Sequence, residues 1–185
     1  MKYQNLIFKP FIFNSVCGWA YKHPTYNHIP ITHQQEKIWG NNITNQIDNN
    51  QWTTKLGENL VYNCLYRLGE NPHRPNKINN YKPDWETDNY IYEVKTRSWT
   101  TKGTAGEKVY GTPLKYAEIP KLYNKPLRIV CVANQEYELT YGNTPIFGND
   151  IRTSQLMFLE FYKYYNIEFI PCTQLIQNLK YNDLF

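Results

Sequence analysis

The chain has 185 residues and a mass of 22.1 kDa, which is the size of a single domain and enough to bury an apolar core. Hydrophobic residues make up 41% and aromatic residues 16%, so we do not expect an intrinsically disordered protein. The net charge is +4, but residues 95–128 hold eight Lys and Arg against two acidic residues. This basic third favours a polyanionic partner, although a solvated lysine surface explains the charge alone equally well.

Membrane and secretory signals are missing from the sequence pattern. No apolar run approaches the roughly 18–20 residues of a membrane span, and the first ten residues lack the apolar core of a secretory signal peptide. The four cysteines are far apart and include no Cys-x-x-Cys pair, so neither a zinc site built on cysteine pairs nor a disulfide scaffold is favoured. We therefore expect an intracellular protein that neither spans a membrane nor is secreted.

The first quarter of the chain has the weakest pattern. Residues 1–52 carry scattered aromatic residues and many asparagines without a lasting period. We predict a short helix over residues 32–39 and a polar loop over residues 41–51. We interpret residues 1–52 as an N-terminal arm attached to a core of residues 53–185.

The core has clearer periodicity. Apolar residues recur at helical spacing from Leu56 to Leu68, in a helix that Thr53 or Thr54 caps and Gly69 ends. We then predict a β-hairpin, a flexible loop, a helix, a buried strand, a helix, a strand and a helix, over residues 81–96, 100–106, 113–122, 127–133, 153–165, 167–170 and 173–179. This order gives an α/β fold in which helices pack around a mixed sheet.

The hairpin brings two carboxylates together. With a four-residue turn at 86–89, Trp85 pairs with Tyr90. Asp84 and Glu93 are then diagonal neighbours on one face, with Cα atoms about 7–8 Å apart. Two carboxylates this close repel unless a cation lies between them, and Mg²⁺ prefers oxygen ligands. Lys95 lies next on the same face, where its ammonium can orient a water molecule or neutralise charge on a phosphate.

Pro83-Asp84, followed after eight residues by Glu93-Val94-Lys95, resembles the motif of the PD-(D/E)xK nuclease superfamily. As an element order, the resemblance covers residues 53–180 and includes a preceding helix that bears Glu58. It implies a restriction-endonuclease-like fold, in which helices flank a mixed β-sheet core, here with an N-terminal extension.

The resemblance also implies a role for each residue of the motif. Asp84, Glu93 and the backbone carbonyl of Val94 would bind Mg²⁺, for which Mn²⁺ can substitute. Lys95 would position the attacking water or stabilise the transition state, and Glu58 would join the metal ligands directly or through water. The implied reaction is hydrolysis of DNA phosphodiester bonds that leaves 5′-phosphate and 3′-hydroxyl ends.

From these residues we expect a site-specific endonuclease of the restriction or homing type that acts on double-stranded DNA. Cutting both strands with one small site per chain requires two chains, so we expect a homodimer or a higher symmetric assembly. The N-terminal arm would serve DNA recognition or dimerisation, because Asn and Gln side chains can read adenine. Two alternatives stay open, a repair or junction-resolving nuclease and a non-catalytic DNA-binding module on a nuclease fold.

Four basic residues after the motif are candidate contacts to the DNA backbone, namely Arg97, Lys102, Lys108 and Lys115. The small residues between Lys102 and Lys108 permit close approach to phosphates. Phosphate contacts are also the commonest class of protein–DNA hydrogen bond. A flexible surface loop explains the same segment equally well.

Overall fold

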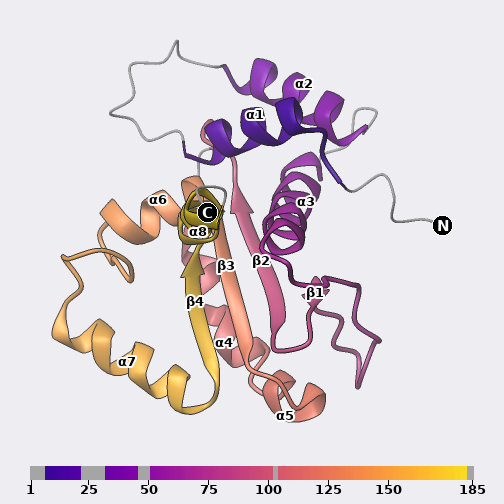
Figure 1. Ribbon diagram of the computed structural model, residues 1–185. Coiled ribbons are helices and arrows are strands. Elements are labelled where there is room, and N and C mark those ends of the chain that lie inside the picture. The colour runs from indigo at the N-terminus through magenta and orange to yellow at the C-terminus, as the bar shows by residue number, and fades with distance from the viewer. Residues whose placement is uncertain (1–6, 22–31, 46–50, 102–103, 183–185) are drawn as a thin grey trace.

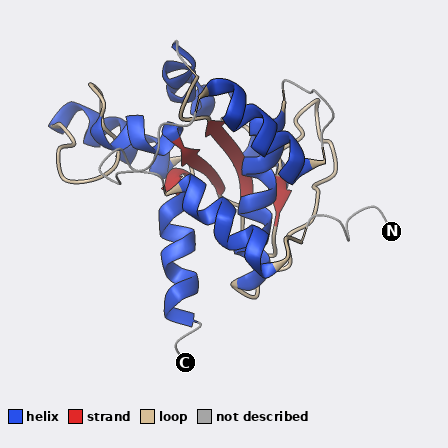
Figure 2. Cartoon of the chain, turned by 90° about the horizontal axis from the view of Figure 1, so that it is seen from above, coloured by secondary structure: helices blue, strands red, loops and turns tan. Residues whose placement is uncertain are grey.

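The computed structural model describes residues 7–21, 32–45, 51–101 and 104–182, and within them it confirms an α/β fold with a mixed sheet. The four strands run in the order β1-β2-β3-β4, with helices on both faces of the sheet (Figures 1 and 2). Strand β1 is antiparallel to β2, whereas β2, β3 and β4 are parallel to one another. The strands are Trp85–Glu86, Ile91–Arg97, Leu127–Ala133 and Ile167–Pro171.

The helices form two layers because successive strand residues point to opposite faces of the sheet. One face carries Tyr92, Val94 and Val130 and packs against α1 (Pro10–Ala20), α3 (Trp52–Arg67) and α8 (Cys172–Asn182). The other face carries Ile91, Ile129 and Cys131. It is covered by the 3₁₀ segment η2 (Thr104–Gly111), α4 (Thr112–Lys115), α5 (Ile119–Tyr123), α6 (Asn134–Tyr141) and α7 (Thr153–Tyr164).

Helix α3 confirms the predicted periodicity and is held close to β2. It begins at Trp52, so Thr53 and Thr54 lie in its first turn instead of capping it, and Gly69 ends it with a φ of 81°. A Cβ atom at Gly57 would overlap the side chain of Thr96. The glycine therefore permits the close approach of α3 to β2.

The register of the hairpin differs from the prediction. Trp85 pairs with Tyr92 and not with Tyr90. The turn holds two residues, 88 and 89, and it is closed by a hydrogen bond from the amide of Thr87 to the carbonyl oxygen of Tyr90 at 2.9 Å. Short hairpin turns favour Asp and Asn, which occupy these two positions.

The shift leaves the predicted faces unchanged because it amounts to two residues. Continued by one residue, the observed register places Asp84 opposite Glu93 instead of diagonal to it. Glu86, which we predicted in the turn, lies in β1 and accepts a hydrogen bond from Lys125 Nζ at 2.7 Å.

The described part of the N-terminal arm contains more helix than its sequence pattern indicates. Helix α1 was not predicted, and its Val16 and Trp19 belong to the same apolar cluster as α3 and α8. Helix α2 (His33–Thr44) confirms the predicted helix, but it includes residues 41–44, which we expected in a loop. The described part of the arm therefore shares one apolar core with the rest of the chain.

A buried carboxylate fixes the chain that leaves β2. Glu36 on α2 is 1% exposed and accepts hydrogen bonds from Trp19 Nε1, the amide of Trp99 and the amide of Thr100 at 2.8, 3.0 and 3.1 Å. Several donors compensate the burial of a charged group. The arm thus holds the segment that directly follows β2.

The remaining elements depart from the prediction at three places. The flexible loop predicted over residues 100–106 ends early, because the 3₁₀ segment η2 begins at Thr104. The helix predicted over residues 113–122 is divided into α4 and α5, with Pro120 in the first turn of α5. Helix α6 follows β3 directly and was not predicted. Strand β3, α7, β4 and α8 match the predicted order. Over the described ranges, no helix has the length and apolar character needed to cross a membrane.

Candidate active site

The residues of the motif lie together in one cavity beside β2. Asp84 comes from the segment before β1, and Glu93, Val94 and Lys95 come from β2. The cavity has a volume of about 640 Å³. Its other lining residues come mainly from the end of β2 and from η2 and α4, and they are Thr54, Thr96, Arg97, Lys108, Val109, Gly111, Thr112, Lys115 and Gln135. The structure therefore brings both predicted carboxylates and the predicted ammonium into one space.

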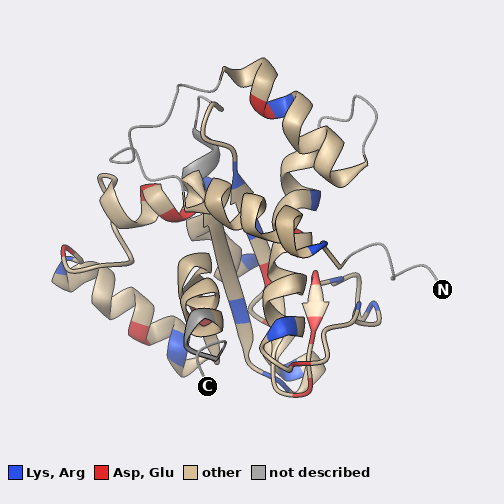
Figure 3. Ribbon diagram, turned by 45° about the horizontal axis from the view of Figure 1, so that its top comes forward, with Lys and Arg blue, Asp and Glu red and all other residues tan. Residues whose placement is uncertain are grey.

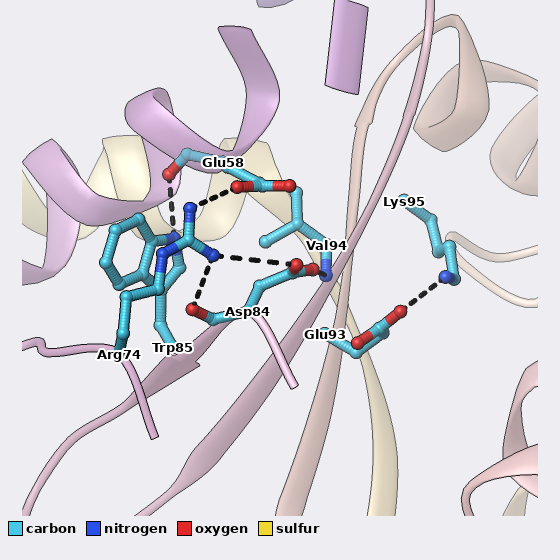
Figure 4. A network of polar contacts seen from close by, with 7 residues as sticks. All are labelled: Glu58, Arg74, Asp84, Trp85, Glu93, Val94 and Lys95. Atoms are coloured by element: carbon cyan, nitrogen blue, oxygen red, sulfur yellow. Dashed lines mark hydrogen bonds and ion pairs between the residues drawn. The ribbon is translucent and has the colours of Figure 1, made fainter. Parts of the chain in front are cut away.

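Asp84 is largely buried between two other carboxylates. Its Oδ2 accepts a hydrogen bond from the amide of Val94 at 2.7 Å (Figure 4). Burial, followed by the negative charges of Glu93 and Glu58, raises the pKa of Asp84 to about 8. The bond from Val94 and the charge of Arg74 act in the opposite direction. Without a cation, Asp84 is therefore largely protonated at neutral pH.

Glu93 and Lys95 form an ion pair on the same face of β2. Lys95 Nζ lies 2.6 Å from Glu93 Oε1 (Figure 4). The side chain of Glu93 is buried, whereas that of Lys95 is partly exposed. Lys95 Nζ also lies 5.7 Å from the centre of the Tyr116 ring. Burial and the neighbouring Glu93 raise the pKa of Tyr116, a residue that our motif analysis did not identify.

Arg74 holds Glu58 and Asp84 at the opposite end of the site, a role that the motif did not predict. Its guanidinium donates to the Glu58 carboxylate and to the carbonyl oxygen of Asp84, the latter at 2.8 Å (Figure 4). It lies 3.8 Å from Asp84 Oδ1 and 3.8 Å from the centre of the Trp85 ring. Trp85 Nε1 in turn donates to the carbonyl oxygen of Glu58 at 2.9 Å.

These contacts give Glu58 a basic partner that the motif did not predict. Among the residues that the structure describes, no group of three or more His, Cys, Asp or Glu side chains is arranged to hold a metal ion. Arg74 binds Oε2 of Glu58, and a carboxylate has a second oxygen that can reach a cation directly or through water. The role of Glu58 in metal binding therefore stays a prediction.

The remaining donor set fits a hard divalent cation. Mg²⁺ usually keeps several waters and takes one or two carboxylates from the protein. Asp84 and Glu93 supply two carboxylates. Burial, followed by the negative charges of Glu93 and Glu58, raises the pKa of Asp84, and a cation would compensate those charges. Val94, whose carbonyl we expected as a further ligand, lines the cavity.

The candidate DNA contacts fall into three groups. Lys108 and Lys115 are exposed and line the cavity, which suits a backbone contact. Arg97 is only 8% exposed, and its guanidinium binds the Glu138 carboxylate and the carbonyl oxygen of Thr101. Arg97 therefore serves the packing of β2 against α6 more directly than it could serve a phosphate. Lys102 lies outside the described residues.

Comparisons of the chain with protein-family models, curated proteins and solved structures found no match. The α/β architecture is a property of the structure, whereas the restriction-endonuclease-like fold stays a prediction from the motif. The geometry of the cavity is therefore the basis on which a function can be proposed.

Proposed function

We propose that this chain is a Mg²⁺-dependent endodeoxyribonuclease of the PD-(D/E)xK superfamily, with a restriction-endonuclease-like fold. The observation that supports it is the arrangement of Asp84, Glu93 and Lys95 in one cavity, with Lys108 and Lys115 beside them. Carboxylates suit a divalent cation and ammonium groups suit a phosphate, so the cavity combines the two chemistries that phosphodiester hydrolysis requires.

In the proposed reaction, Asp84 and Glu93 hold the cation. The bound Mg²⁺ supplies a Lewis acid that shares the negative charge of the scissile phosphate. Lys95 lies against Glu93 and can turn toward the attacking water once that carboxylate has another positive partner. The water oxygen bonds to phosphorus as the P–O3′ bond breaks. The water gives up its proton to solvent and the departing O3′ takes one from solvent, which leaves a 5′-phosphate and a 3′-hydroxyl.

The substrate we propose is double-stranded DNA, cut at specific sites as by restriction or homing enzymes and by a symmetric homodimer. The basic residues 95–128 favour a polyanion, and four of them line the cavity, namely Lys95, Arg97, Lys108 and Lys115. Glu36 ties the N-terminal arm to the segment after β2, which would couple DNA recognition by the arm to the position of the site.

The decisive experiment is incubation of the purified chain with supercoiled plasmid and Mg²⁺, followed by sequencing of the DNA ends. We expect unique ends, no cutting with EDTA, and cutting restored by Mn²⁺. Asp84→Asn should abolish cutting, whereas Asp88→Asn, at an exposed turn position, should cut like the wild type. Cutting confined to flaps or four-way junctions would indicate a repair nuclease. Binding without Mg²⁺-dependent cutting of any DNA would overturn the proposal in favour of a non-catalytic module.

A further inference from the structure

Helix α7 presents an apolar stripe to solvent. Its outward side chains Met157, Phe158, Phe161 and Tyr164, with Tyr165 at its C-cap, are each at least 50% exposed. Their spacing of i, i+1, i+4, i+7 and i+8 places them on one side of a helix. This is the spacing of a helix face that packs against another element, yet the stripe points away from the sheet.

The stripe is not needed to hold α7 on the sheet. The opposite side of the helix carries Leu159 and Tyr162, which pack against the apolar cluster on that face of the sheet. The rings of Tyr162 and Phe169 lie 6.4 Å apart. Helix α7 therefore has one apolar side that packs on the sheet and a second apolar side that the described residues leave uncovered.

The uncovered area is large for a soluble protein. Four of the five side chains are aromatic, and an aromatic side chain buries about 150–250 Å² when it is covered. At the observed exposures, which run from 50% to 83%, these four rings present on the order of 500 Å². That is a large share of the roughly 800 Å² per partner that a stable protein interface buries.

The geometry points to a second copy of this chain as the occupant, and we propose that α7 forms a two-fold homodimer interface. A two-fold interface requires a surface that is complementary to itself. The stripe meets this condition because it is symmetric about Phe161. In an antiparallel pair of helices, Phe161 would meet its own copy, Met157 would face the copy of Tyr165, and Phe158 would face that of Tyr164.

The charges of α7 agree with a protein partner. Glu160 and Lys163 are exposed but lie outside the stripe, so pairing the helices buries no charged residue of α7. Figure 3 shows few charged residues along this helix. A DNA backbone would require basic groups in the stripe, and a helix that lies on a membrane usually carries a strongly basic polar face.

The inference rests on the proposed function in one respect, because cutting both strands of a duplex requires two sites and the dimer would supply the second.

The test measures the mass of the full chain by sedimentation velocity over a range of micromolar concentrations. We expect a dimer for the wild type and a monomer for Phe161→Asp, because two carboxylates would meet at the two-fold axis. The matched control is Tyr141→Asp, at an exposed tyrosine of α6 outside both the stripe and the N-terminal arm, which should stay dimeric.

Circular dichroism checks that each variant folds, and Tyr164→Glu, at the most exposed position of the stripe, replaces Phe161→Asp if that variant unfolds. A monomeric wild type, a dimeric Phe161→Asp or Tyr164→Glu, or binding of the stripe to lipid vesicles instead of a second copy would overturn the inference.

Plasmid cleavage by the same proteins separates the inference from the proposed function. Wild type should release linear DNA directly, and Phe161→Asp should accumulate nicked circles. A dimer that cuts nothing would support the interface and contradict the nuclease proposal. A monomer that cuts would support the nuclease proposal and contradict the interface.

Discussion

The two ends of the candidate site each pair a carboxylate with a cation, but the two cations are held very differently. Arg74 is fixed by the Glu58 carboxylate, by the carbonyl oxygen of Asp84 and by the ring of Trp85. Lys95 lies on a flexible four-carbon stem against Glu93, is partly exposed and reaches into the cavity. Arginine forms a rigid planar fork, whereas lysine is a movable point charge.

This difference suits the two cations to different roles, one in positioning the site and the other in the proposed reaction. A guanidinium with several fixed partners holds the backbone and side chain of Asp84 in place. An ammonium that can turn from Glu93 toward a water or a phosphate suits the proposed reaction. We therefore expect Arg74 to control the position of the carboxylates and Lys95 to control the rate.

The largest effect expected from changing either of the two cations is on the cutting rate of Lys95→Met. Removing one group that stabilises a transition-state charge costs about 10²–10³-fold in rate. DNA binding and the circular dichroism spectrum should stay close to those of the wild type, since Lys95 is not part of the apolar core. Single-turnover cleavage assays measure the loss, with Lys121→Met, at an exposed site on α5, as the matched control. A Lys95→Met enzyme that cuts at the wild-type rate would contradict the assignment of Lys95.

The next effect is the pH dependence of cation binding. The pKa of Asp84 is raised to about 8, above the value of about 4 for a carboxyl group in an unfolded chain. Between these values the folded chain holds more protons than the unfolded chain, so its stability without a cation falls as the pH rises from about 4 to about 8. A cation requires the ionised carboxylate, so its affinity should rise about tenfold per pH unit and level off above about pH 8.

Calorimetric titration with Mn²⁺ between about pH 6 and about pH 8.5 measures this dependence. Asp84→Asn removes the group whose pKa is raised, so its affinity should be weaker and nearly independent of pH. A wild-type affinity that is already constant at about pH 6 would show that Asp84 is ionised there and would contradict its raised pKa.

The third prediction tests whether Arg74 positions Asp84 for the cation. Arg74→Met should weaken Mn²⁺ binding about tenfold at neutral pH, equivalent to about 1.4 kcal/mol, because Asp84 loses both a positioning partner and the positive charge that lowers its pKa. Glu58→Gln alone should change the affinity much less, because Arg74 also binds the carbonyl oxygen of Asp84. If Glu58→Gln weakens Mn²⁺ binding as much as Glu93→Gln does, Glu58 is itself a metal ligand.

The sequence was sufficient to predict where Glu93 and Lys95 lie relative to each other, and insufficient to predict the position of Arg74. Glu93 and Lys95 share a face because side chains alternate along one strand, which is a local rule. The predicted face of Asp84 was correct despite the wrong register, because the register error was an even number of residues. Arg74 lies in an irregular connection, and its position depends on Trp85 and Glu58, which no spacing rule relates to it.

The missed helices have different physical reasons. Helix α6 buries only Gln135 and Leu139, so it has no apolar stripe for periodicity to detect. Helix α1 did carry a signal, since Pro10 stands in its first turn and Phe13, Val16 and Ala20 recur at helical spacing. The prediction of α7 was confirmed, but the sequence pattern could not show that its stripe of exposed apolar residues, from Met157 to Tyr165, faces solvent.

The smallest expected effect is on the salt dependence of DNA binding, and it concerns the two exposed lysines that line the cavity. Lys108→Gln and Lys115→Gln should each reduce the dependence of log affinity on log salt by about 0.9, the value for one released counterion. Each substitution should weaken DNA binding by similar amounts on all sequences, because a phosphate contact carries no base information. Lys121→Gln, exposed on α5 outside the cavity, provides the matched control, and binding measured between about 50 and 200 mM salt gives the slopes. Equal slopes for all three variants would mean that the cavity does not face the DNA backbone, and Lys95 would then have no phosphate to reach.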